Sequence, residues 1–313
     1  MTAPGTAGGA RLAGRLALAR ATVDRSAVRR TDASWLAQAW ADPATRVLRV
    51  GAGRTLVDDG ALVLVPPQEA PPGERYLLGV EPHGPAYFAV DEGHAPEPPP
   101  GRAAVTAGLR EVGTVLSDRD AGLLVLAVGL SNWHATHSRC PRCGAPTRVE
   151  DAGFVRRCPR DASEHYPRTD PAVIMLVTDA GGERALLGSS SRWPGRRFST
   201  LAGFVEPGES AEAAVVREVA EESGVAVAEV TYLGSQPWPF PSSLMIGFTA
   251  RAVDPDAEPV ADGVELTEVR WFSRSDLAEG LREGSLLLPP PVSIARRLVE
   301  HWYGGELPDG AGW

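Results

Sequence analysis

The chain has 313 residues, of which 43% are hydrophobic and 23% charged, and its formal net charge is −9. This length is enough for two or three domains, and no apolar run is long enough to span a bilayer. The acidic balance argues against a general nucleic-acid coat protein, which needs a positive field. Because the sequence contains no lysine, arginine must make every cationic contact with phosphate.

The N-terminal segment is interrupted by Arg11, Arg15 and Arg20 and lacks a secretory hydrophobic region. We therefore expect residues 1–24 to be a flexible tail, with a targeting peptide as the alternative. Only three cysteines occur, clustered between 140 and 158. An odd cluster is not a disulfide framework and favours a reducing cytoplasm.

Residues 25–137 predict a β-rich α+β domain. Short β-like runs at 61–65, 76–80 and 86–90 are separated by Pro/Gly clusters, and residues 95–101 predict a loop. Ser117 is a plausible N-cap for a helix over 118–137. Near its end lie His134 and His137, which we interpret as ordinary, partly exposed histidines.

Residues 169–305 alternate strands and helices, and residues 306–313 predict a second tail. A hairpin is expected from 172–177 and 184–188, joined by the turn "DAGG". A helix is expected between Ser210 as N-cap and Gly224 at its C-terminal end. A last helix is expected over 293–302.

The helix after Ser210 carries a cluster of glutamates. An apolar face recurs at a spacing of four, at Ala211, Val215 and Val219. Glu218, Glu221 and Glu222 fall on another face, where like charges destabilise a helix unless solvent or a cation neutralises them. The alternatives are a solvated acidic face and a metal site.

The loop before this helix favours the metal site. Gly203 and Gly208 flank a tight turn that leads into the helix N-terminus, where backbone N–H groups can face a phosphate. Arg217 lies beside the carboxylates and is placed to orient Glu209 through a bidentate contact.

The full pattern, G-x5-E-x7-R-E-V-x-E-E-x-G-V over residues 203–225, resembles the Nudix hydrolases. The resemblance implies an α/β/α sandwich with a mixed sheet and Mg²⁺- or Mn²⁺-assisted hydrolysis of a nucleoside diphosphate linked to another moiety. It implies that Glu218 and Glu222 are metal ligands, that Glu221 is a further ligand or general base, and that Arg217 belongs to the catalytic group. Hard cations held by carboxylates suit this reaction, because they neutralise the diphosphate and activate water.

A glutamate from a later loop often completes the metal shell in this superfamily. The segment "GVELTEVRWF" offers Glu265 and Glu268. We favour Glu265 as the third ligand, with Glu268 as the structural alternative.

The stretch "SQPWPFPSSLM", from Ser235 to Met245, alternates prolines with aromatics. Each proline fixes its own φ and extends the preceding residue, so we expect a stiff ribbon that cannot pair normally in a sheet. Its aromatics either fill a core or bind a ligand at a low entropic cost.

This stretch resembles the signature of one Nudix branch, the NADH pyrophosphatases, and the resemblance runs from about 140 to 302. It implies hydrolysis of NAD(H) to NMN(H) and AMP, removal of the NAD cap from RNA to give NMN and 5′-monophosphate RNA, and a homodimer. Phe204 would stack on nicotinamide, and Tyr166 would be supplied across the dimer interface. The implied substrate-binding residues are Tyr166, Ala202, Phe204, Gln236, Pro237, Trp238, Pro239, Phe240, Pro241, Ser242, Ser243 and Ala295.

Residues 138–168 resemble a zinc ribbon with one substitution. The spacing Cys140-x2-Cys143-x14-Cys158-x2-Asp161 places aspartate where many members of the branch have a fourth cysteine. Zinc accepts Asp oxygen or His nitrogen, so Asp161 or His165 would close a structural site. The alternative is a ribbon that has lost its metal.

Two other functions stay open at this point. One is hydrolysis of another dinucleotide, such as ADP-ribose or a diadenosine polyphosphate. The other is a non-catalytic sensor that binds a nucleotide. Arg192, Arg196 and Arg197, just before the glutamate motif, are candidate phosphate contacts.

Overall fold

The structure is a computed structural model that describes residues 12, 16–99, 101, 103–193 and 195–308. The described residues divide into two compact units. The C-terminal unit comprises residues 12 and 16–17, the described residues of 170–236, and residues 244–308. The N-terminal unit comprises the described residues of 18–169 together with residues 237–243.

The C-terminal unit is built on one sheet in the order β14-β15-β11-β12-β16, with β13 paired to β11. The predicted hairpin is confirmed, because Val177 pairs with Leu186 and Thr178 with Ala185 in antiparallel register. The strand bounds are β11 Asp170–Thr178, β12 Arg184–Ser190, β13 Leu201–Phe204, β14 Val227–Trp238, β15 Ser243–Ala252 and β16 Leu266–Ser273.

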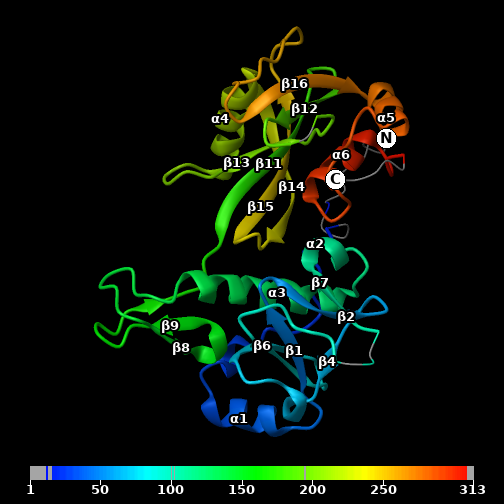
Figure 1. The fold of residues 1–313 in the computed structure, drawn as a ribbon. Coiled ribbons are helices and arrows are strands. Elements are labelled where there is room, and N and C mark those ends of the chain that lie inside the picture. The colour runs from blue at the N-terminus through cyan, green and yellow to red at the C-terminus, as the bar shows by residue number, and fades with distance from the viewer. Residues whose placement is uncertain (1–11, 13–15, 100, 102, 194, 309–313) are drawn as a thin grey trace, which may run out of the picture. The chain divides into compact units, whose positions relative to one another are not determined.

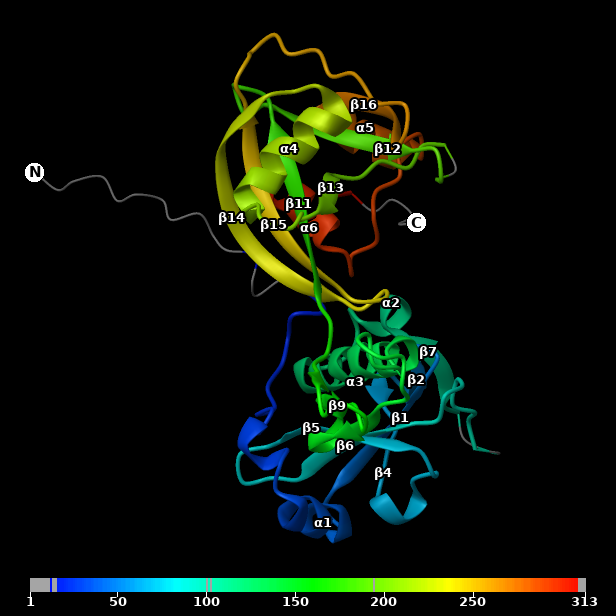
Figure 2. The ribbon, with the colours of Figure 1, turned by 90° about the vertical axis from the view of Figure 1, so that its left-hand side faces the viewer.

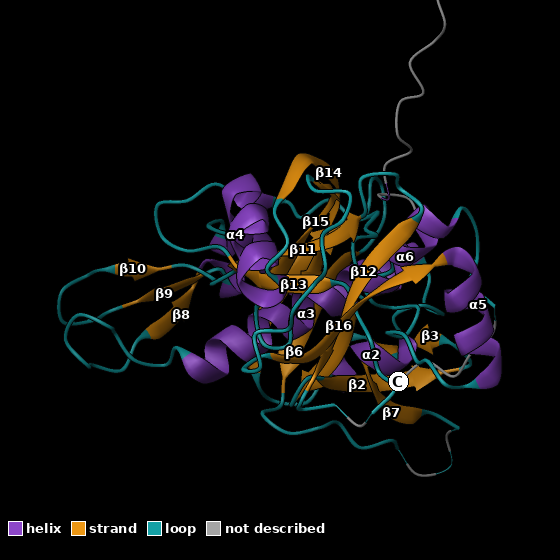
Figure 3. Ribbon diagram, turned by 90° about the horizontal axis from the view of Figure 1, so that it is seen from above, coloured by secondary structure: helices purple, strands orange, loops and turns teal. Residues whose placement is uncertain are grey.

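Helices cover both faces of this sheet. Helix α4 (Ala211–Ser223) lies on one face, and α5 (Arg274–Glu283) and α6 (Ile294–Tyr303) lie on the other (Figure 1, Figure 2, Figure 3). The predicted caps of α4 are confirmed: Ser210 Oγ accepts a hydrogen bond from Ala213 N, and Gly224 adopts φ 69°. The α/β/α sandwich is therefore confirmed.

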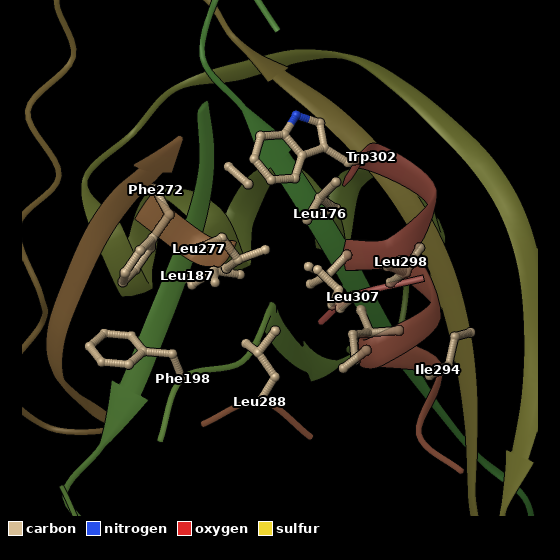
Figure 4. Close-up of a cluster of buried hydrophobic side chains, with 14 of the residues drawn as sticks. Leu176, Leu187, Phe198, Phe272, Leu277, Leu288, Ile294, Leu298, Trp302 and Leu307 are labelled. Atoms are coloured by element: carbon tan, nitrogen blue, oxygen red, sulfur yellow. The ribbon is translucent and has the colours of Figure 1, made fainter. Parts of the chain in front are cut away.

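The alternation of side chains along β11 produces the two cores. Val173, Met175 and Val177 pack with Val215 and Val219 of α4. The alternate residues Ile174 and Leu176 belong to the other core. Figure 4 shows Leu176 in this core, together with Leu298, Trp302 and Leu307. A strand buried on both faces reads as a continuous apolar run, as the segment "AVIMLV" does.

The N-terminal unit is also built on a sheet, in the order β3-β2-β1-β6-β5, with β4 paired to β1 and β7 paired to β2. Its strands are β1 Arg46–Gly51, β2 Arg54–Asp58, β3 Ala61–Leu62, β4 Leu64–Val65, β5 Glu74–Val80, β6 Ala86–Asp91 and β7 Val105–Gly108. Its helices are α1 Ala33–Ala41, α2 Leu109–Val112 and α3 Asp118–Thr136, and its short 3-10 turns are Ala27–Arg29, Pro67–Glu69 and Asp151–Gly153. Ser117 Oγ accepts from Asp120 N, which confirms the predicted start of α3.

A small three-stranded sheet, ordered β10-β9-β8, carries the cysteine segment (Figure 3). Its strands are β8 Arg148–Glu150, β9 Val155–Arg157 and β10 Glu164–His165. Short strands and turns suit a module that a metal holds together, because the apolar core of such a module is small.

The terminal segments differ from the expected tails. Leu12 and Leu16 are buried in the core beneath α6, and Asp24 N donates to Val80 O. At the other end, Leu307 is buried in the same core. Parts of both segments are therefore packed, because Leu12, Leu16 and Leu307 bury apolar area in this core. The remainder of both segments lies outside the described residues.

Within the part of the chain that the structure describes, no helix is long and apolar enough to cross a membrane.

His134 is buried, contrary to the expected partial exposure. Its Nε2 lies 2.9 Å from Gly153 O, and its Nδ1 lies 2.8 Å from Arg156 Nη1. Because a guanidinium only donates, Nδ1 accepts and the ring is neutral. Burial lowers the pKa of His134 to about 4, and the Arg156 charge acts in the same direction, while the Gly153 hydrogen bond and Asp91 oppose it.

This lowered pKa predicts acid sensitivity of the N-terminal unit. The unfolded chain takes up a proton near pH 6.5, whereas the folded His134 resists it until about pH 4. The free energy of unfolding should therefore fall as the pH drops through this window. Urea unfolding from pH 7 to pH 4 should show a steeper loss for the wild type than for His134→Gln. His137→Gln is the matched control, and equal slopes for all three proteins would contradict the prediction.

Candidate functional site

The loop before α4 and the helix itself fit together through a glycine. A Cβ atom at Gly203 would overlap the carboxyl group of Glu218. Gly203 lies in β13, opposite Val173 of β11. The absence of a side chain at Gly203 thus allows the Glu218 carboxylate to lie directly against the sheet.

Arg217 organises the acidic residues around it. Its Nη2 donates to Glu209 Oε1 at 2.6 Å and to the Phe204 carbonyl at 3.0 Å. Its Nη1 donates to Glu218 and to Glu221, each at 2.9 Å. These hydrogen bonds hold the pKa of Glu209 below its usual value and raise that of the guanidinium. Arg217 therefore fixes loop and helix together and occupies one oxygen of Glu218.

Glu222 is a buried carboxylate without sufficient partners. Glu222 is 6% exposed, and its Oε2 atom is buried with no hydrogen-bond partner among the described residues. Burial raises the pKa of Glu222 to about 8, and the negative charges of Glu218, Glu265 and Asp262 add to this effect. A hydrogen bond with the Ala202 backbone acts in the opposite direction. A buried, repelled carboxylate with a free oxygen is an arrangement that a cation would stabilise.

A cavity of about 230 Å³ opens beside this carboxylate. Glu222 and Glu265 both line it, together with Ala202, Arg192 and Trp193. Strand β13 thus contributes one wall, the loop after β12 a second, and the loop before β16 a third.

Asp262 shapes the loop that presents Glu265. Its carboxylate accepts hydrogen bonds from the backbone N–H groups of Val264, Glu265 and Leu266 at 2.9–3.2 Å. These bonds lower the pKa of Asp262. An Asp-Gly turn held in this way fixes the loop backbone that carries Glu265.

Glu218, Glu222 and Glu265 fit the chemistry of a divalent-cation site but do not form a closed shell. Burial raises the pKa of Glu218, and so do the charges of Glu221 and Glu265, whereas Arg217 lowers it. Among the described residues, the ligand atoms that do lie close together belong to the cysteine segment and not to these glutamates. Glu268, the alternative to Glu265, instead pairs with Arg270 at 2.9 Å.

The cysteine segment brings four ligand atoms together. Those of Cys140, Cys143, Cys158 and Asp161 all lie within 4.8 Å of one another. Although burial opposes it, hydrogen bonds with Ser163 and with the Arg142 and Cys143 backbone lower the pKa of Cys140 to about 6. His165, the alternative fourth ligand, is 3.2 Å from Ser163 Oγ. Three thiols and one carboxylate at this separation fit tetrahedral zinc.

The proline–aromatic stretch pairs in a sheet, which corrects the expected unpaired ribbon. Strand β14 continues to Trp238, residues 239–242 form the turn, and β15 begins at Ser243. Because β14 is an edge strand, Pro237 within it does not interrupt a ladder on both sides. The Gln236 side chain is fully buried and donates to Val292 O at 3.0 Å.

The tip of this hairpin belongs to the N-terminal unit, where two side chains hold it. Asn132 Nδ2 donates to the carbonyls of Pro239 and Pro241 at 2.9 and 3.1 Å. The Arg110 guanidinium lies 4.4 Å from the centre of the Phe240 ring and 5.5 Å from that of Trp238. The two rings meet edge to face with centroids 4.9 Å apart. The Trp238–Phe240 pair is thus held in one arrangement.

The other predicted substrate residues differ in exposure. Phe204 and Tyr166 are 60% and 63% exposed, unusual for aromatics, and Tyr166 OH donates to Glu164. Ala202 lines the acidic cavity. Ala295 is buried in the core beneath α6. Pro237, Ser242 and Ser243 are partly buried and Pro239 buried, while Pro241 is exposed.

Sequence reasoning missed several residues of these sites. Asp262 had a usable signal, since Asp-Gly is a turn former. Trp193 had a weaker signal as an aromatic within the arginine-rich loop. Asn132 and Arg110 had none, because each is more than a hundred residues from the hairpin tip that it contacts. Of the three candidate arginines, Arg192 lines the cavity, whereas Arg196 donates to Gly284 O.

Comparison with known proteins gives three domain matches. Residues 168–288 match the NUDIX domain, 135–166 the NADH pyrophosphatase zinc ribbon domain, and 44–133 the NADH pyrophosphatase-like rudimentary NUDIX domain. A crystal structure of a NUDIX hydrolase from Nitrosomonas europaea is similar with a TM-score of 0.41 and 22% identity, covering 54% of this chain and 95% of that one.

Two curated relatives are similar over long stretches. The NAD-capped RNA hydrolase NudC of Mycobacterium tuberculosis is 41% identical over 301 residues, which are 92% of this chain and 95% of that protein. The human NAD-capped RNA hydrolase NUDT12 is 41% identical over 198 residues, which are 60% of this chain and 42% of that protein. The glutamate helix, the cysteine module and this long similarity agree, and the chain therefore belongs to the Nudix hydrolase family, in its NADH pyrophosphatase branch.

Proposed function

We propose that this protein hydrolyses the pyrophosphate bond of NAD(H) to NMN(H) and AMP, and removes the NAD cap from RNA to leave NMN and a 5′-monophosphate end. The observation that carries the proposal is Glu222, a buried carboxylate with one orphaned oxygen beside a cavity that Glu265 also lines. The names and extent of the relatives support the choice of substrate.

Glu218, Glu222 and Glu265 would hold the divalent cations, Mg²⁺ or Mn²⁺. When bound, such cations neutralise diphosphate charge and lower the pKa of a coordinated water. In the reaction, a water oxygen bonds to one phosphorus while the bond from that phosphorus to the bridging oxygen breaks. Glu221, which is exposed and bonded to Arg217, is the candidate base that accepts the proton from this water. Arg217 holds the loop before α4 against the helix through its hydrogen bonds to both.

The aromatic residues would bind the bases of the dinucleotide. Trp238 and Phe240 are held together before any ligand binds, which lowers the entropy lost on binding. Stacking of one base on an aromatic ring contributes about 1–3 kcal/mol. Phe204 and Tyr166 expose ring area, and we assign Phe204 to nicotinamide and Tyr166 to the substrate of the other protomer in a homodimer.

We also propose three domains: an N-terminal domain over 25–137, a zinc ribbon over 138–168 and a Nudix domain over 169–305. Three free thiols near one carboxylate support structural zinc and a reducing, cytoplasmic location.

Glu222→Gln should lower kcat for NADH by at least about 100-fold, because a neutral amide cannot replace a metal-binding carboxylate. Its thermal stability should not fall, since the exchange removes a buried repelled charge. Turnover is measured by chromatography of NMNH and AMP in the presence of Mn²⁺. Glu268→Gln, outside the cavity, is the matched control. Wild-type turnover by Glu222→Gln would refute the role of Glu222 as a metal ligand. A kcat/KM that is higher for ADP-ribose than for both NADH and NAD-capped RNA would refute NAD(H) as the substrate.

Asn132→Ala should raise KM for NADH about three- to tenfold with little change in kcat. It removes two hydrogen bonds that fix the hairpin tip, each worth about 0.5–1.5 kcal/mol. Steady-state kinetics separate the two constants. Gln38→Ala, an exposed amide on α1, is the control. If KM is unchanged, or if kcat falls as much as KM rises, the Asn132 hydrogen bonds do not position a substrate-binding segment.

Asp161→Ala should lose most of the bound zinc in a competing chelator, whereas Asp161→Cys should retain it, because a fourth thiolate completes the same shell. Zinc content is measured by elemental analysis after dialysis. His165→Ala tests the alternative ligand. Retention by Asp161→Ala together with loss in His165→Ala would reverse the assignment.

A further inference from the structure

The N-terminal unit contains a larger cavity, of about 680 Å³, that the proposed hydrolysis does not use. Its walls come from β5, β6, α3 and the cysteine module. A volume of 300–1,000 Å³ is typical of small-molecule sites. Two arginines and two carboxylates are among the residues that line it.

Arg156 lines this cavity and is 8% exposed. Its Nε donates to Thr147 Oγ1 at 2.7 Å, its Nη2 to Thr147 O at 3.3 Å and its Nη1 to His134 Nδ1 at 2.8 Å. All three acceptors are neutral, and none of the described carboxylates lies within ion-pair distance. Buried charges are normally paired, so this guanidinium lacks a counter-charge.

The hydrogen bonds of Arg156 also leave donors unused. A guanidinium has five N–H groups, and these contacts take one from each nitrogen. One further N–H on each Nη nitrogen is therefore available to a ligand. Because His134 donates its own N–H to Gly153 O, the ring accepts from Arg156 and supplies no negative charge.

Arg148, on the edge strand β8, is a second cation that lines the cavity. It is exposed, and no described residue forms a hydrogen bond or ion pair with its guanidinium. Two guanidinium groups without carboxylates present planar donors that match the oxygens of a phosphate.

Two carboxylates also line the cavity. Asp91 accepts a hydrogen bond from Tyr76 OH at 3.2 Å, and Glu74 is exposed. The Tyr76 ring stacks on His134, with centroids 4.6 Å apart. Carboxylates accept hydrogen bonds from hydroxyl groups, so Asp91 and Glu74 favour a hydroxylated body over a second anion.

We propose that this cavity binds a small phosphate monoester on a hydroxylated body, such as a sugar phosphate. Its phosphate contacts Arg156 and Arg148, and its hydroxyls donate to Asp91 and Glu74. The proposal is independent of the hydrolase reaction, because none of these side chains belongs to the acidic cavity beside Glu222.

The test is calorimetric titration of the full chain with ribose 5-phosphate, without added Mg²⁺ or Mn²⁺. We expect one site per chain whose Kd rises at least about tenfold in Arg148→Gln and in Glu74→Gln, since each loses a charge-assisted hydrogen bond. Arg29→Gln, another exposed arginine of the same unit, should bind as the wild type does. Both test positions are exposed, so these variants are expected to fold, as circular dichroism would verify.

Two further arms locate the site and define its ligand. Glu222→Gln should bind ribose 5-phosphate normally, and weaker binding would place the sugar phosphate in the acidic cavity and overturn the proposal. Inorganic phosphate should bind at least about tenfold more weakly than ribose 5-phosphate, because it lacks the hydroxyls. Equal affinity would overturn the role of Asp91 and Glu74. No heat of binding up to about 10 mM, or unchanged affinity in Arg148→Gln, would overturn the site.

Discussion

The burial of the Glu222 carboxylate among like charges is the constraint on which the rest of the C-terminal unit depends. The group lies near the C-terminal end of α4, where the helix dipole also disfavours negative charge. The Ala202 backbone provides a hydrogen bond, but Oε2 has no described partner. The fold tolerates this cost because the apolar core that contains Val215 and Val219 holds the helix against the sheet.

Arg217 explains how the surrounding carboxylates remain close together. It bonds to Glu209, Glu218, Glu221 and the Phe204 carbonyl, so one cation joins the loop to the helix. The close approach of Glu218 to Gly203 depends on the same arrangement. Arg217 orients Glu218 through a hydrogen bond to one of its oxygens. None of the hydrogen bonds given above for Arg217 goes to Glu222, so the arginine does not neutralise that carboxylate.

The N-terminal unit contributes more than a scaffold. It includes the tip of the hairpin whose strands belong to the Nudix sheet, and Asn132 fixes the two proline carbonyls at this tip. Asn132 also lines the larger cavity, as Arg156 does. Helix α3 thus contributes both to the contact with the hairpin tip, through Asn132, and to the separate cavity.

The sequence by itself predicted the N-cap of α3, both caps of α4 and the β11–β12 hairpin, because these follow from local patterns. The family and the α/β/α sandwich were implied by the resemblance of one dense motif to the Nudix hydrolases. It did not predict the burial of Leu16, His134 or Glu222, since burial depends on which distant segments pack against a residue. It also missed Asn132 and Arg110, whose partners lie far along the chain. Local patterns determined which chemistry the residues carry. Tertiary packing alone decided which charges lack partners, because desolvation arises only when separate elements close around a side chain.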